Sequence, residues 1–84
     1  MEFKVENNRI YCENNDGKIV AQITFSEIKE GVYDINHTFV DESLRGQNIG
    51  KKLVQMAIGE IQKKNGKIEA TCSYAKHYIE KNMK

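Results

Sequence analysis

Eighty-four residues are enough for one small domain with a single core. Thirteen basic residues against twelve acidic ones leave a net charge of +1, so no strong overall field draws the protein to nucleic acid or to an anionic membrane. No segment reaches the ~18 apolar residues of a membrane span, and the start of the chain lacks the apolar run of a secretion signal. Cys12 and Cys72 lie far apart without the spacing of a metal site. We therefore expect one cytoplasmic domain over residues 1–84, with reduced thiols and no metal.

The first part of the chain predicts short strands joined by a tight turn. Apolar and polar residues alternate over residues 3–5 and again over residues 9–13, which is the period of half-buried strands. Residues 14–17, Asn-Asn-Asp-Gly, predict a hairpin turn because Asn, Asp and Gly accept positive φ angles. The next strand is predicted over residues 18–27.

A further strand is predicted from Val32 to Val40. The more apolar of its two alternating sets is expected to face the core, and this set contains Tyr33, Ile35, His37 and Phe39. A histidine between isoleucine and phenylalanine is typical of a hydrogen-bonded core residue, but it is also a candidate for removing a proton from a substrate. Both interpretations of His37 stay open.

The stretch that follows Val40 joins this strand to a predicted helix through a polar loop. The loop contains Arg45 and Gly46, and Gly50 follows within the first turn of the helix. A helix N-terminus has unpaired backbone N–H groups and a partial positive charge, which together favour phosphate oxygens. Gly46 and Gly50 keep side chains out of the way of such a ligand. The alternative interpretation is a tight turn with no ligand.

The helix is predicted from about residue 47 to residue 65, because apolar residues recur along one face. Asn65-Gly66 predicts its end, with Gly66 in the left-handed cap. A strand over residues 67–71 and a short helix over residues 74–81 complete the chain. A strand, a helix and a second strand in this order imply a parallel crossover.

These elements predict an α+β fold. An antiparallel meander of three or four strands is followed by a parallel β-α-β crossover and a short C-terminal helix. Ligands of such sheets bind outside the carboxyl ends of the parallel strands. Both the glycine loop and Cys72 are expected at that crevice.

Three short motifs, in this order, resemble the GCN5-related N-acetyltransferases (GNAT) and especially their very small single-domain members. The motifs are His37-Thr38, Arg45-Gly46 and Cys72-Ser73-Tyr74. Residues 45–50 are similar to the family's loop, in which Arg or Gln is followed by two residues, Gly, one residue, and Gly or Ala. Asn48 stands at the first glycine position, and asparagine is the next most tolerant residue of left-handed backbone angles.

The resemblance implies acetyl-CoA or coenzyme A as the cofactor and an amine of a small molecule or protein as the acceptor. It implies that backbone groups of Phe39 and Val40 bind the pantetheine. The residues that it places at the pyrophosphate are Arg45, Gly46, Gln47, Asn48, Ile49, Gly50 and Lys51. No nucleic acid or membrane partner is expected, and the chain is expected to be a monomer or a weak homodimer.

The resemblance leaves two routes of transfer open. In the first, the amine attacks the thioester directly, and solvent or His37 removes its proton. In the second, Cys72 as thiolate takes the acetyl group and passes it on, as the resemblance to the small members suggests. The start of a final helix would lower the pKa of this thiol, although a buried cysteine can also serve only packing.

Departures from the larger members favour a competing function. Their last helix has a tyrosine that protonates the CoA thiolate, and Ile79 occupies that position here. Tyr74 and Tyr78 remain as candidate acids, and Glu42 remains as a candidate base. The alternative is an acyl-CoA-binding or protein-interaction module without transferase activity.

Overall fold

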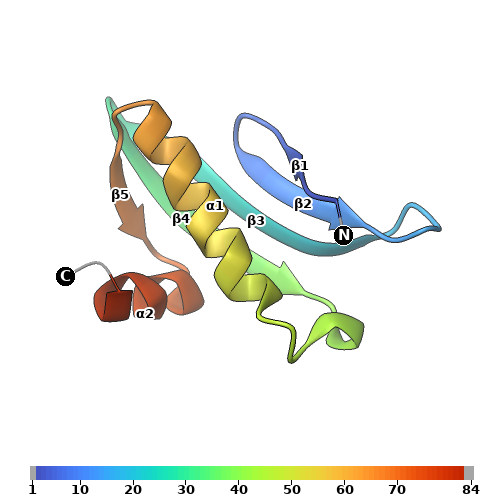
Figure 1. Cartoon of the computed structure of the whole chain (residues 1–84). Coiled ribbons are helices and arrows are strands. Elements are labelled where there is room, and N and C mark those ends of the chain that lie inside the picture. Colours follow the sequence, from blue (N-terminus) through green and yellow to red (C-terminus); the bar gives the residue numbers. More distant parts are fainter. Residues whose placement is uncertain (1, 83–84) are drawn as a thin grey trace.

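The computed structural model describes residues 2–82 and contains one five-stranded sheet with the strand order β1-β2-β3-β4-β5 (Figure 1). The strands are β1 (Lys4–Val5), β2 (Arg9–Glu13), β3 (Ile19–Lys29), β4 (Val32–Val40) and β5 (Lys67–Ala70). The helices are α1 (Ile49–Lys63) and α2 (Ser73–Asn82), and a 3₁₀ turn, Glu42–Leu44, precedes α1. Strands β1 to β4 pair antiparallel, and β4 pairs with β5 in parallel. The predicted α+β fold with a parallel crossover is confirmed.

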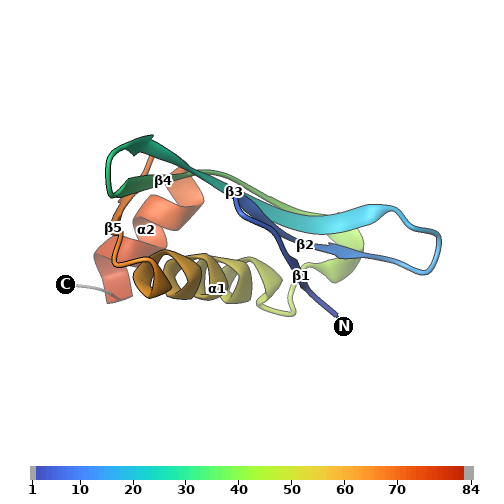
Figure 2. The same cartoon turned by 90° about the horizontal axis from the view of Figure 1, so that it is seen from above.

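Both helices lie on the same face of the sheet (Figure 2). The apolar stripe of α1 supplies much of the core through Leu53, Val54, Ala57 and Ile61. The sheet contributes alternate residues of β3, namely Ala21, Ile23 and Phe25. Ala75 of α2 is fully buried in the same cluster, so α2 is packed onto the core rather than left at its edge.

The turns have the predicted left-handed residues, except that Asn65 takes this conformation in place of Gly66. Gly17 has a φ of +80° in the β2–β3 hairpin, as expected. At the end of α1 the left-handed residue is Asn65, with a φ of +57°, and not Gly66. The prediction for Gly66 is therefore wrong, and packing explains the glycine instead. A Cβ atom on Gly66 would lie 2.6 Å from the ring of Tyr33.

A β-bulge in β4 changes which residues of this strand face the core. Thr24 pairs with His37, but the next residue, Phe25, pairs with Ile35, so Asn36 has no partner residue on β3. The side chain of Asn36 instead bonds with those of Thr24 and Ser26 on the outer face of the sheet.

The bulge reverses the alternation for the second half of β4. Ile35 is buried, as predicted, but His37 and Phe39 beyond the bulge are exposed on the outer face. Thr38 and Val40 face the helices in their place. The prediction that His37 and Phe39 face the core is therefore wrong, because it assumed an unbroken strand.

Candidate functional site

The parallel strands β4 and β5 separate halfway along β4. Ala70 at the end of β5 pairs with Ile35, whereas β4 continues to Val40. The backbone N–H groups of Thr71 and Cys72 both donate to the carbonyl oxygen of Ile35, at 3.2 and 3.1 Å, and the chain then turns into α2. The second half of β4 therefore has an open edge, as expected for the crevice.

Asp34 holds the chain at the point of separation. Its carboxylate is buried and accepts two hydrogen bonds from Thr71, each of 2.8 Å, one from the backbone N–H and one from the hydroxyl. A buried carboxylate needs such donors because it has lost its water. These bonds fix the residue that precedes Cys72. Asp34 is not among the residues predicted for the site, although an aspartate inside a strand was the available signal.

The backbone of β4 shows which groups face the open edge. The N–H of Asp41 donates to the carbonyl oxygen of Val20 on β3 at 2.8 Å. Backbone groups of successive strand residues point to opposite neighbours, so the N–H and C=O groups of Phe39 also point toward β3. Those of Thr38 and Val40 point toward the open edge. The backbone groups of Phe39 and Val40 were the ones expected at the crevice. Those of Val40 do face it, but those of Thr38 face it instead of those of Phe39.

The loop before α1 leaves the helix N-terminus open to a ligand. Asn48 adopts the left-handed conformation with a φ of +59°, and Gly46 does so with +86°. The side chain of Asn48 makes no capping hydrogen bond, and the first turn of α1 contains no acidic residue. The first N–H groups of α1, from Ile49 to Lys51, are therefore available to an anion.

A cavity of about 330 Å³, here called the splay cavity, joins the open edge to this loop. Thr38, Val40, Arg45, Gly46, Gly50 and Tyr74 line it. A Cβ atom on Gly50 would lie 2.9 Å from the hydroxyl oxygen of Tyr74, so this glycine makes room for the tyrosine. This contact between Tyr74 and Gly50 joins segments that are far apart in the sequence, and no local sequence pattern predicted it.

Cys72 is partly buried beside the splay cavity, and its Sγ atom lies 3.5 Å from Oγ1 of Thr38. Partial burial raises the pKa of this thiol. The hydroxyl of Thr38 and the backbone N–H groups of Ala75, Tyr74 and Thr38 outweigh that effect, so the pKa lies below its usual value. The direction agrees with the expectation for a thiol at the start of the last helix, but the hydroxyl of Thr38 on β4 is the largest single cause of the lowering.

The remaining candidate residues lie apart from this thiol. His37 is exposed on the outer face, opposite to Thr38, so the structure does not bring it to Cys72. Glu42 is exposed on the 3₁₀ turn before the loop. Tyr78 lies on α2 and lines a second cavity. Of the candidate side chains for acid or base chemistry, Tyr74 is the one that lines the splay cavity.

Two further classes of site are absent from residues 2–82. This part of the chain has no group of three His, Cys, Asp or Glu side chains that could hold a metal ion. It also has no helix that is long and apolar enough to cross a membrane.

The fold and site define a class of protein: a crossover α+β sheet whose two parallel strands splay apart beside a helix N-terminus open to anions. The family model described as GCN5-related N-acetyl-transferase matches residues 9–84. This match covers most of the chain, so the protein belongs to the GCN5-related N-acetyltransferase family. The resemblance seen in the three motifs is confirmed at the level of the family.

Individual relatives agree with this assignment. A GCN5-like protein from Staphylococcus aureus, solved by NMR, is 36% identical with a TM-score of 0.78, covering 95% of this chain and 78% of that one. A second S. aureus acetyltransferase of the family shares the fold, with a TM-score of 0.70 and 24% identity over 88% of this chain and 50% of its own.

Curated relatives match a shorter stretch. Protein NATD1 of mouse and of chicken is 27% identical over 62 residues, which are 74% of this chain and 56% of the relative. This chain thus spans little more than half the length of these relatives.

Proposed function

We propose that this protein transfers an acetyl group from acetyl-CoA to an amine, with the thioester held where β4 and β5 separate. One observation supports this most directly: the splay cavity is lined both by Thr38, whose hydroxyl contacts the Cys72 thiol of lowered pKa, and by Arg45 and Gly46 of the loop. A thioester and a diphosphate, the two ends of the pantetheine arm, need these two environments.

The chemistry of the lining fits acyl-CoA. The open-edge backbone groups of Thr38 and Val40 would pair with the amides of the pantetheine, as an added strand does. The N–H groups of Ile49 to Lys51 would hold the pyrophosphate, and the exposed Arg45 would add a charge-assisted contact. Gly46 and Gln47 complete this loop.

Transfer through Cys72 takes two balanced steps. The Cys72 thiolate attacks the thioester carbonyl and forms an acyl-cysteine, while the CoA sulfur leaves with its electron pair and takes a proton. Tyr74 is the candidate donor of that proton, since it lines the same cavity. The acceptor amine then attacks the acyl-cysteine, Cys72 leaves as thiolate, and the amine proton passes through solvent to the Tyr74 phenolate, which restores the acid. His37 has no part in this route.

Thermal unfolding with and without acetyl-CoA tests binding. A ligand at 100 times its Kd adds about 2.7 kcal/mol to the free energy of unfolding. For a chain of this size the Tm should then rise by roughly 10–20 °C.

A matched pair of variants locates the bound ligand. Gly46→Glu should abolish the shift because it puts a carboxylate at the phosphate site. Gly31→Glu is the control: it also replaces a left-handed glycine with open space around it, but at the far end of β4. If the Tm of the wild type does not rise with millimolar acetyl-CoA, or if Gly46→Glu keeps the rise as Gly31→Glu does, the loop is only a turn and the proposal fails.

Intact-mass measurement after incubation with acetyl-CoA tests the route. The Cys12→Ala protein should gain one acetyl group, and the Cys72→Ala protein should gain none. Cys12 is a suitable control because it is buried in the core on β2. Amine acetylation that survives Cys72→Ala would show direct attack, and binding without acetylation of any tested amine would show a binding module.

A further inference from the structure

Strand β5 forms one edge of the sheet, and no strand within residues 2–82 lies beyond it (Figure 1). A free edge presents unpaired N–H and C=O groups to which another strand can add. Proteins usually block such edges with a proline, a bulge or charged side chains. β5 contains no proline, and its register with β4 runs without a shift. Whether the edge can pair therefore depends on its charged side chains.

The backbone of β5 shows which of its groups face the open side. The N–H of Lys67 donates to the carbonyl oxygen of Gly31, just before β4, at 2.7 Å. Backbone groups of successive strand residues point to opposite neighbours, so those of Lys67 and Glu69 point toward β4. The N–H and C=O groups of Ile68 and Ala70 point to the open side. These two residues can therefore form the backbone hydrogen bonds of a further strand.

A groove of about 260 Å³, here called the edge groove, lies between the open side of β5 and α2. Its lining residues are Ile68, Glu69, Ala70, Lys76, Ile79 and Glu80. Successive residues of β5 point to opposite faces of the sheet, so a groove lined by three of them in a row follows the edge itself. Its volume is below the roughly 300–1,000 Å³ of ligand pockets, which favours a strand over a small molecule.

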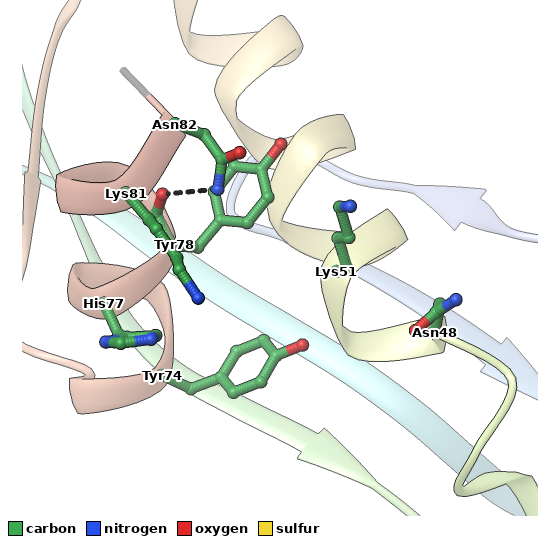
Figure 3. A pocket seen from close by; sticks show the side chains of 7 residues that line it. All are labelled: Asn48, Lys51, Tyr74, His77, Tyr78, Lys81 and Asn82. Atoms are coloured by element: carbon green, nitrogen blue, oxygen red, sulfur yellow. Dashed lines mark hydrogen bonds between the residues drawn. The ribbon is translucent and has the colours of Figure 1, made fainter. Parts of the chain in front are cut away.

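The orientation of α2 leaves one of its sides to the edge groove. The rings of Tyr74 and Tyr78 project from α2 toward α1 (Figure 3). Ile79 lies on a different side of the helix and lines the edge groove together with Ile68. Both isoleucines are partly buried against the core. An added strand that places an apolar side chain here would extend this apolar contact.

The side chains of β5 are complementary to those of a second, antiparallel copy of β5. Ile68 and Ala70 pack against the core, so Lys67 and Glu69 lie on the outer face of the sheet, where both are exposed. Neither forms an ion pair within residues 2–82. A two-fold axis at Ile68 places Lys67 of each copy opposite Glu69 of the other. A lysine that usually protects an edge thus finds a carboxylate in its own twin.

The backbone independently favours the same register. With the axis at Ile68, the two Ile68 residues exchange both of their backbone hydrogen bonds, because their groups point to the open side. Lys67 and Glu69 then form the pair without backbone bonds, in which side chains lie closer together. The other possible axis, at Ala70, places Glu69 opposite Thr71 and forms no ion pair.

We propose that two copies of this chain pair antiparallel through β5 and join their sheets into one. Two Lys67–Glu69 ion pairs cross the outer face, and the two Ile68 side chains meet on the face that carries the helices. The contact uses the same surface of both copies, so it closes at a dimer. This inference does not depend on the proposed function.

Sedimentation equilibrium of the full chain over a range of concentrations tests the inference. The wild type should dimerise reversibly. Lys67→Glu replaces both ion pairs with pairs of like charge and should raise the dissociation constant of the dimer by about tenfold or more. Lys29→Glu is the matched control and should leave this constant nearly unchanged. It makes the same change in net charge at an exposed lysine of β3, which is separated from β5 by β4.

A mixture of two variants tests the register. In the Lys67→Glu protein both outer side chains of β5 are carboxylates, and in the Glu69→Lys protein both are lysines, so each protein alone should stay monomeric. Mixed in equal amounts, they should form a heterodimer, because each lysine then lies opposite a carboxylate. Added salt should weaken this heterodimer, since exposed charges are screened.

Hydrogen exchange in the wild type locates the contact. The N–H groups of Ile68 and Ala70 should become protected as the protein concentration rises, whereas those of β1, at the opposite edge of the sheet, should exchange at an unchanged rate.

Three results would overturn the inference. A wild type that stays monomeric at millimolar concentration shows that β5 does not pair with itself and leaves its edge to an extended segment of another protein. A dimer that is unaffected by Lys67→Glu uses a different surface. Variants that fail to associate when mixed, although the wild type dimerises, refute the register centred on Ile68.

Discussion

Removing the Asp34 carboxylate is expected to destabilise the fold and to loosen the segment that holds Cys72. Asp34 is only 6% exposed and accepts two hydrogen bonds of 2.8 Å from Thr71. Hydrogen bonds to a charged group contribute about 1.5–3 kcal/mol each. The Thr71 N–H also donates to Ile35, at 3.2 Å, so one of the two losses is partly compensated. We therefore expect Asp34→Ala to lower the free energy of unfolding by about 2–4 kcal/mol.

Chemical and thermal denaturation of four proteins measures the link between the two side chains. The set is the wild type, Asp34→Ala, Thr71→Val and the double variant, and the coupling energy should be about 1–2 kcal/mol. Glu69→Ala is the control, because Glu69 has an exposed carboxylate and is the residue of β5 that lies opposite Asp34 in the strand register. Its effect should stay within about 0.5 kcal/mol.

A second readout follows the site directly. If the link positions Cys72, alkylation of this thiol should change in rate in Asp34→Ala and remain unchanged in Glu69→Ala. Additive effects of Asp34→Ala and Thr71→Val, within about 0.3 kcal/mol, would refute the reasoning, since a bonded pair must couple.

Two further predictions concern stability. The pKa of the Cys72 thiol is lower in the fold than in the unfolded chain, so its ionisation stabilises the fold above the unfolded pKa, and the contribution is lost as the pH falls through the folded pKa. The Tm difference between wild type and Cys72→Ala should therefore change in favour of the wild type from about pH 6 to about pH 9, and a constant difference would contradict it. Gly66→Ala should destabilise by about 1–3 kcal/mol, since its Cβ would lie 2.6 Å from the Tyr33 ring, whereas Gly59→Ala, with open space in α1, should stabilise by about 0.5–1 kcal/mol. Denaturant titration distinguishes the signs.

Local patterns were sufficient to predict most elements. The strand from Val32 to Val40 has the predicted bounds, and the structure places the helix and the parallel strand after it where periodicity indicated. The helix is two residues shorter at each end than predicted, because Asn48 and Asn65 adopt left-handed angles just outside it. The polar loop before the helix was also recognisable, since glycine and asparagine at these positions reflect backbone angles that other residues avoid.

The face that each residue of β4 presents depended on the tertiary structure. At the bulge the side chain of Asn36 forms hydrogen bonds with those of Thr24 and Ser26, which belong to the neighbouring strand β3. The bulge moved His37 out of the core and turned Thr38 toward the helices, and no local pattern in β4 signals the change.

The sequence by itself determined the order of elements, the glycine-containing loop before α1 and the thiol at the start of α2, because periodicity and backbone preference act over a few residues. Only the tertiary structure decided which groups meet. The seat of Tyr74 over Gly50, the bond from Asp34 to Thr71 and the cavity between α1 and α2 each join segments separated by at least one whole element. Such contacts depend on how the elements pack, and packing is a property of the whole chain.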